Sequence, residues 1–173
     1  PWPRYATDYK ALVDYAKTRG WPVVAANVPR PIASEVAKTG VQVLAGKPDA
    51  ERPWFAADRE CPTGDDPYFI RFGEAMGGHA GVDVLQRYYD SQCLKDETMA
   101  ESITRAWQAA AGVPGPTRPL VIHYNGAFHS DFGLGTVSRV RRRLPDQQLA
   151  VVTMIPVKDV GALDTLTPDE EDV

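Results

Sequence analysis

Apolar positions recur along the chain with two spacings, and these predict an alternation of helices and strands. A spacing of three to four residues, typical of amphipathic helices, occurs in five segments: residues 8–19, 28–39, 67–76, 82–110 and 134–142. Three shorter runs that are apolar on both faces, as buried parallel strands are, cover residues 21–27, 120–124 and 149–155. Helices alternating with apolar strands predict an α/β fold, with a mostly parallel sheet flanked by helices and one long helix.

The expected sheet has too few strands to be whole. A sheet covered on both faces normally has more than three strands, so we expect the sheet to be incomplete in this chain. The length of 173 residues fits one domain, which we place at residues 1–156, followed by an acidic tail at residues 157–173. The chain begins without Met and enters a helix almost at once, so we expect it to be a processed or truncated piece of a longer protein.

Charge and composition narrow the classes of partner. The net charge of −4 gives no indication of nucleic-acid binding, and no apolar run approaches the ~20 residues of a transmembrane helix. The basic run Arg139–Arg143 fits either the last turn of a helix, where cations favour the dipole, or a patch for an anion or a partner. Cys61 and Cys93 match no zinc motif, and they form either a disulfide or two free thiols.

Two polar residues interrupt the apolar stripe of the long helix. On a helical wheel, Gln92 and Asp96 fall in the middle of the stripe that runs from Leu85 to Trp107. A carboxylate that faces the interior is costly unless it is paired or hydrogen-bonded. The two side chains therefore either cap backbone groups or pair with an arginine, or they line a polar cavity and orient a ligand, a metal or a metal-bound histidine.

A histidine follows the apolar run at residues 120–124. The carboxyl end of a strand in an open α/β sheet is where ligands bind, and Gly126 allows the backbone to turn sharply there, so we expect His129 to project over the sheet edge. His79, flanked by glycines before the long helix, is a second candidate. His123 lies within the apolar run, which favours a core histidine.

Sequence motifs of common enzyme classes are missing. No GxSxG elbow, phosphate loop, dinucleotide fingerprint or HExxH motif occurs. One histidine and one carboxylate do not complete a zinc site, which takes three or four ligands. The residues thus predict a polar site built from His129, His79, Asp96 and Gln92, with at least one contributor missing from the chain.

Several segments together resemble the ChaN-like haem-binding uptake proteins, whose superfamily includes the TIKI metalloproteases and erythromycin esterases. The resemblance covers about Tyr5 to Pro156 and rests on four stretches: "LVDYAKTRGWPVVAANVPR", "YYDSQCLKDETMAESI", "GAFHSDFGLG" and "RRRLPDQQLAVVTMIPV". Under this resemblance Gly126 and His129 match a Gly-x-x-His motif that follows a strand. Gln92, Asp96, Met99 and Ala100 match the family's long-helix motif, and His79 matches a histidine before that helix.

The resemblance also implies a missing part. The family's domain usually begins with a strand that ends in Gly-Glu-x-His, followed by a second acidic strand end, and this chain contains neither. It is therefore similar to the carboxy-terminal two-thirds of such a domain, and the absent amino-terminal part is its expected partner. The family implies haem as cofactor, a homodimer, and a place in the bacterial periplasm or cell envelope, with a lipid anchor on the absent segment.

Two hypotheses for function follow, and they differ on whether the protein is an enzyme. In the first, it is a haem-binding accessory protein of iron uptake, without turnover. In the second, it is a metal-dependent hydrolase in which His129 and the absent Gly-Glu-x-His hold a divalent metal ion, with Asp96 orienting the ligand.

Overall fold

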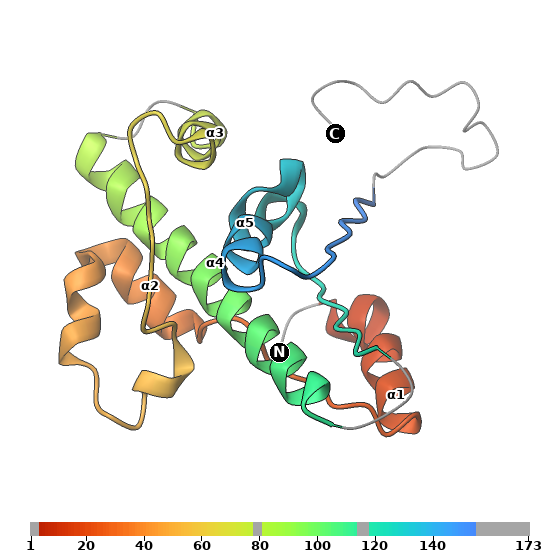
Figure 1. The fold of residues 1–173 in the computed structure, drawn as a ribbon. Coiled ribbons are helices and arrows are strands. Elements are labelled where there is room, and N and C mark those ends of the chain that lie inside the picture. The colour runs from red at the N-terminus through yellow and green to blue at the C-terminus, as the bar shows by residue number, and fades with distance from the viewer. Residues whose placement is uncertain (1–3, 78–80, 114–117, 155–173) are drawn as a thin grey trace, which may run out of the picture.

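The computed structural model describes residues 4–77, 81–113 and 118–154, and in these ranges the molecule is built from helices (Figure 1). Each of the five predicted helices is present: α1 (Lys10–Thr18), α2 (Arg30–Thr39), α3 (Pro67–Ala75), α4 (Val82–Ala111) and α5 (Gly135–Arg143). Short helical turns join them: Tyr5–Tyr9, Val41–Gly46, Arg52–Trp54, Ala127–His129 and Asp131–Gly133.

The long helix α4 is the axis on which α2, α3 and α5 pack. Figure 1 shows it crossing the molecule diagonally, with α2 on one side and α5 on the other. Three apolar clusters follow its length. The cluster with α2 contains Val28, Ile32, Ala33, Val36, Leu44, Phe55 and Leu94; that with α3 contains Tyr68, Phe72 and Tyr89; that with α5 contains Ala100, Val140 and Leu144.

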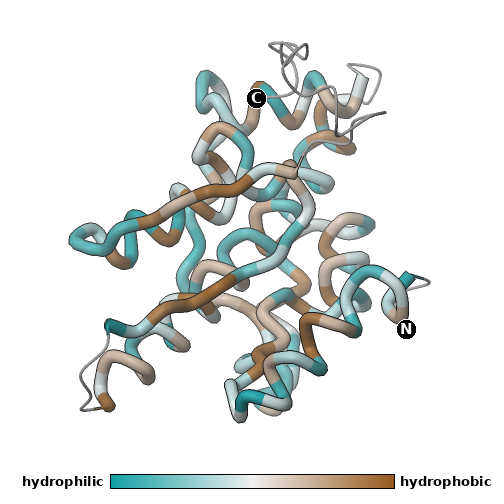
Figure 2. The backbone as a smooth tube through the Cα atoms, turned by 90° about the vertical axis from the view of Figure 1, so that its right-hand side faces the viewer, coloured by the Kyte–Doolittle hydropathy of each residue, from teal (hydrophilic) through white to brown (hydrophobic). Residues whose placement is uncertain are grey.

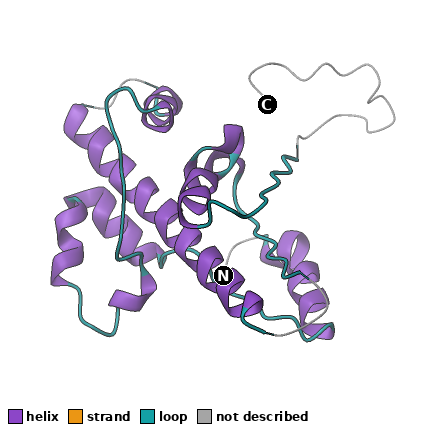
Figure 3. Ribbon diagram, viewed as in Figure 1, coloured by secondary structure: helices purple, strands orange, loops and turns teal. Residues whose placement is uncertain are grey.

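The predicted α/β fold is wrong, because no residue in the described ranges belongs to a strand (Figure 3). The three apolar runs are extended, yet none is hydrogen-bonded to another as a strand. Each run carries a strongly exposed apolar side chain: 56% for Val24, 80% for Leu120 and 85% for Val152. Figure 2 shows hydrophobic stretches of extended chain crossing the face that lies on the right-hand side of Figure 1.

The segment from Phe55 to Cys61 is attached to α4 by a disulfide and two hydrogen bonds. Cys61 and Cys93 form a disulfide, which settles the alternative that the sequence left open. The backbone N–H of Ala56 donates to the Thr98 hydroxyl at 3.1 Å, and that of Glu60 donates to the Glu97 carboxylate at 3.0 Å. Closing a loop of this size stabilises the folded state by about 4 kcal/mol on the chain-entropy estimate.

The basic run at the end of α5 surrounds a buried acid. Glu97 of α4 is 0% exposed, and its carboxylate accepts from Arg139 at 3.1 Å, from Arg142 at 3.0 Å and from Arg143 at 2.5 Å. These arginines do lie in the last turns of a helix, as one alternative predicted. Their side chains bind the carboxylate, and so α5 is fixed to α4 by charge as well as by apolar contact.

Within the described ranges, no helix combines the length and the apolar character needed to cross a membrane.

Neutralising Glu97 is expected to destabilise the fold. In a Glu97→Gln variant three guanidinium groups lose their shared anion, and the free energy of unfolding should fall by about 3 to 5 kcal/mol. Glu101→Gln is the matched control, because Glu101 pairs on the same helix with Arg105, whose side chain is 59% exposed. That control should lose less than about 1 kcal/mol in urea unfolding. Equal losses in the two variants would contradict the role given to Glu97.

Candidate functional site

Asp96 is a carboxylate held entirely inside the protein. It is 0% exposed and lies at the middle of α4. Its Oδ2 accepts a hydrogen bond from the Tyr68 hydroxyl at 2.6 Å, and its Oδ1 accepts one from the Thr136 hydroxyl at 2.8 Å. His129 Nδ1 lies 2.8 Å from the same Oδ1. These contacts satisfy the buried charge, which explains how an acid occupies the apolar stripe of the helix.

Each partner of Asp96 comes from a different element. Tyr68 is in the first turn of α3, where the Asp66 side chain caps the helix by accepting from the N–H groups of Tyr68 and Phe69. Thr136 is in the first turn of α5, and His129 ends the turn Ala127–His129. Burial, and then the nearby Asp96 charge, raise the pKa of the Tyr68 phenol, so Tyr68 stays a hydrogen-bond donor.

The contact with Asp96 fixes the protonation of the His129 ring. A carboxylate only accepts hydrogen bonds, so Nδ1 carries the hydrogen and donates it to Asp96. The Gln92 amide nitrogen lies 3.2 Å from the same Nδ1. Because Nδ1 is itself a donor, this amide donates instead to the Tyr68 hydroxyl at 3.1 Å. In the neutral ring, Nε2 keeps its lone pair on the edge that faces away from Asp96. The arrangement therefore offers a ligand one oriented imidazole nitrogen.

A cavity of about 390 Å³ lies beside this ring. Aromatic side chains dominate its apolar walls, and Phe128 stacks near both Tyr68 and Phe72, at centroid distances of 5.5 and 6.1 Å. His129 itself is 17% exposed in its side chain. The lining residues are Phe72, Ala75, Gln92, Gly126, Ala127, Phe128 and His129.

A glycine other than the expected one allows the His129 turn to pack. The chain turns at Gly126, whose carbonyl accepts from the His129 N–H at 2.9 Å, but its φ of −69° is an ordinary value and a Cβ there would meet open space, so the turn does not require glycine. Gly135 has φ +51°, and a Cβ there would lie 2.6 Å from the His129 carbonyl oxygen. Close approach of α5 to the His129 turn therefore requires Gly135.

The structure brings together most of the residues that the sequence singled out. His129 is hydrogen-bonded to Asp96, the Gln92 amide lies against the same ring nitrogen, and Gly126 lines the cavity. His79 lies outside the described residues. Tyr68 and Thr136 were not predicted, because their place in the first turn of a helix does not indicate what their hydroxyls bind.

His123 is half-buried, and its buried Nε2 has no hydrogen-bond partner in the described part of the chain. Burial lowers the pKa of His123 below its usual 6.5, and the neighbouring His129 lowers it further, against an opposing effect of Asp96. The lowered pKa favours the neutral ring, but a half-buried side chain with an unpartnered Nε2 differs from the core histidine that the sequence favoured.

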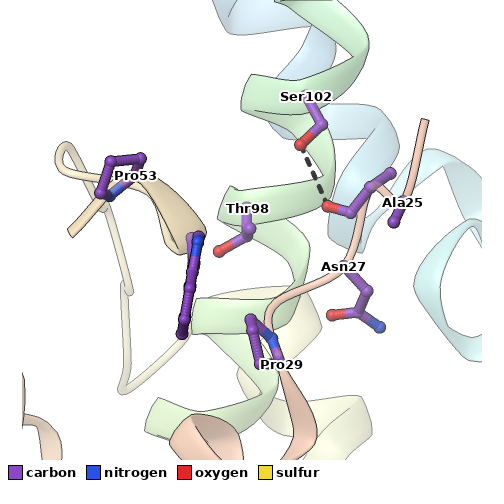
Figure 4. A pocket seen from close by; sticks show the side chains of 8 residues that line it. Ala25, Asn27, Pro29, Pro53, Thr98 and Ser102 are labelled. Atoms are coloured by element: carbon purple, nitrogen blue, oxygen red, sulfur yellow. Dashed lines mark hydrogen bonds between the residues drawn. The ribbon is translucent and has the colours of Figure 1, made fainter. Parts of the chain in front are cut away.

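A second cavity of about 310 Å³ lies where the turn at residues 25–29 meets α4 (Figure 4). The Ser102 hydroxyl donates to the Ala26 carbonyl at 3.1 Å across it, and Pro53 and Trp54 form the facing wall. It shares no lining residue with the His129 cavity.

Alanine at position 135 is expected to destabilise the His129 turn. The positive φ and the approach of the His129 carbonyl both oppose a Cβ, so Gly135→Ala should lower the free energy of unfolding by more than about 1 kcal/mol. Gly126→Ala, in the same turn but with room for a Cβ, should change it by less than about 0.5 kcal/mol or raise it slightly. Chemical unfolding of both variants decides this, and a Gly126→Ala loss as large as that of Gly135→Ala would refute it.

Acid is expected to weaken the fold through His123. Because its folded pKa lies below its unfolded value of 6.5, the unfolded chain binds more protons in the interval between the two. The neutral His123 ring therefore contributes its full stability above pH 6.5. This contribution is lost as the pH falls through the lowered pKa of His123 in the folded protein. Urea unfolding between pH 8 and 4 should therefore show a shallower acid decline for His123→Leu than for the unaltered protein, and identical slopes would contradict this assignment.

Comparison with known proteins agrees with the resemblance seen in the sequence. The family model described as "Haem-binding uptake, Tiki superfamily, ChaN" matches residues 1–140, which is most of the chain. Neither the search of curated proteins nor that of solved structures found a match. The chain therefore belongs to the ChaN family of haem-binding uptake proteins, within the Tiki superfamily.

Proposed function

We propose that this protein binds haem in the His129 cavity, as an accessory to iron uptake. The observation that carries the proposal is the Asp96–His129 pair: a fully buried carboxylate orients an imidazole on the wall of an apolar, aromatic cavity. A hydrogen bond of this kind fixes the ring and raises the basicity of the nitrogen opposite, as it does in many metal-binding histidines. Membership of a haem-binding uptake family supports the same ligand.

The residues of the cavity fit the chemistry of haem. The macrocycle is flat and apolar, and Phe72 and Phe128 supply aromatic contact surface for it. If haem binds here, His129 Nε2 is the nitrogen that would hold its iron, because a histidine is one of the residues that bind haem iron in proteins. When bound, the haem supplies an iron centre that accepts this ligand.

The hydrolase hypothesis asks more of the protein than this site offers. A catalytic zinc site takes three protein ligands. Across the described ranges, no group of three His, Cys, Asp or Glu side chains is arranged to hold a metal ion. That hypothesis takes its other ligands from the absent Gly-Glu-x-His motif, so it stays the alternative to the haem proposal.

The disulfide supports a place in the cell envelope. Disulfides persist in oxidising compartments such as the bacterial periplasm and are rare in the cytosol, and Cys61 and Cys93 are paired. We propose on this ground that the protein acts in the periplasm or cell envelope. The lipid anchor and the homodimer stay predictions from the family resemblance.

Hemin titration of the purified chain, followed by its Soret absorption, tests the function. The unaltered protein should shift and sharpen the Soret band, and His129→Ala should weaken binding at least about 10-fold because the nitrogen that would hold the iron is gone. Asp96→Asn should weaken binding by about 10- to 100-fold through loss of ring orientation. Circular dichroism of each variant establishes that it has folded.

Asn27→Ala in the second cavity is the matched control and should bind hemin as the unaltered protein does. Absence of any spectral change with the unaltered chain would overturn the proposal. An unchanged affinity in His129→Ala would remove this residue from the site.

A further inference from the structure

Arg71 places a positive charge at the rim of the His129 cavity. It lies on α3 one turn before Ala75 and directly before Phe72, and both of these line the cavity. Its guanidinium carbon is 5.3 Å from the ring centroid of Phe128, another lining residue. The Arg71 side chain is 30% exposed, so the charged group is accessible from solvent.

The guanidinium is held in place by a second aromatic ring on a strained backbone. Its central carbon lies 4.4 Å from the ring centroid of Phe132. Phe132 has φ +57°, the one non-glycine residue with a positive φ among those described, and it is 52% exposed. Core packing does not account for a large apolar residue in this conformation, whereas stacking on Arg71 does.

The hydrogen-bonding capacity of Arg71 is largely unused. A guanidinium has five N–H donors, and the contact found for this one is Nη2 to Asp131 Oδ2 at 3.2 Å. Arg71 Nε and Asp131 Oδ1 are both buried without a partner in the described part of the chain. Asp131 thus fixes the direction of the guanidinium through Nη2, and Nη1 has no hydrogen-bond partner among the described residues.

We propose that Arg71 binds a carboxylate of the ligand in the His129 cavity, which for haem is a propionate group. This inference rests on the proposed function. A ligand with an apolar body and an anionic edge matches an apolar cavity that has one cation at its rim. Arginine is suited to the task because its planar donors engage a carboxylate through two parallel hydrogen bonds.

Binding of hemin and of hemin dimethyl ester, in which both carboxylates are esterified, tests the inference. Arg71→Met should weaken hemin binding roughly 10-fold, the usual scale of one charge-assisted hydrogen-bonded contact. The same variant should bind the dimethyl ester as tightly as the unaltered protein does. Arg71→Lys keeps the charge without the planar fork and should give an intermediate affinity for hemin.

Arg105→Met is the matched control, because it removes one positive charge from an exposed position on α4. It should leave both affinities unchanged. Equal hemin binding by Arg71→Met and the unaltered protein overturns the assignment of Arg71, as does an equal loss of hemin and its ester. Failure of the unaltered protein to bind either compound instead overturns the proposed function.

Discussion

Two consecutive carboxylates buried at the centre of α4 determine how α3, α5 and the His129 turn pack on this helix. Asp96 and Glu97 are both 0% exposed, and because successive helical residues point about 100° apart, they face different neighbours. Glu97 gathers three arginines of α5, while Asp96 gathers Tyr68, Thr136 and His129. A buried charge without partners is so costly that α3, α5 and the His129 turn must all close on α4 together.

The same requirement prepares the candidate site before any ligand arrives. His129 is oriented by Asp96, Asp96 is held by Tyr68 and Thr136, and Tyr68 packs against the aromatic wall of the cavity. Gly135 allows the close approach on which this arrangement depends. The site therefore has little side-chain freedom to lose on binding, which is the usual basis of preorganised recognition.

The helices could be predicted from the sequence because they depend on the local spacing of apolar residues. The strands and the partners of the buried hydroxyls could not, because they depend on residues distant in the sequence. Helices appear as a spacing of apolar residues, and all five are present. A strand exists only by pairing with another strand, so the apolar runs around Val24, Leu120 and Val152 had the composition of strands without the partners. The sequence placed Asp96 and His129 in one polar site, and the two side chains are in contact, although the expected sheet is wrong. Tyr68 and Thr136 carried no signal, because nothing in a helix pattern says what a hydroxyl will bind.

The disulfide between Cys61 and Cys93 makes the stability of the fold depend on the redox state of its compartment. Its contribution of about 4 kcal/mol is a large share of the 5–15 kcal/mol that holds a typical domain together. Cys93 directly follows Gln92, whose amide contacts the His129 ring, so the bridge anchors the helix turn that carries the site. A chain kept in a reducing cytosol would lack this bond, so refolding of the purified chain needs a thiol oxidant to recover its full stability.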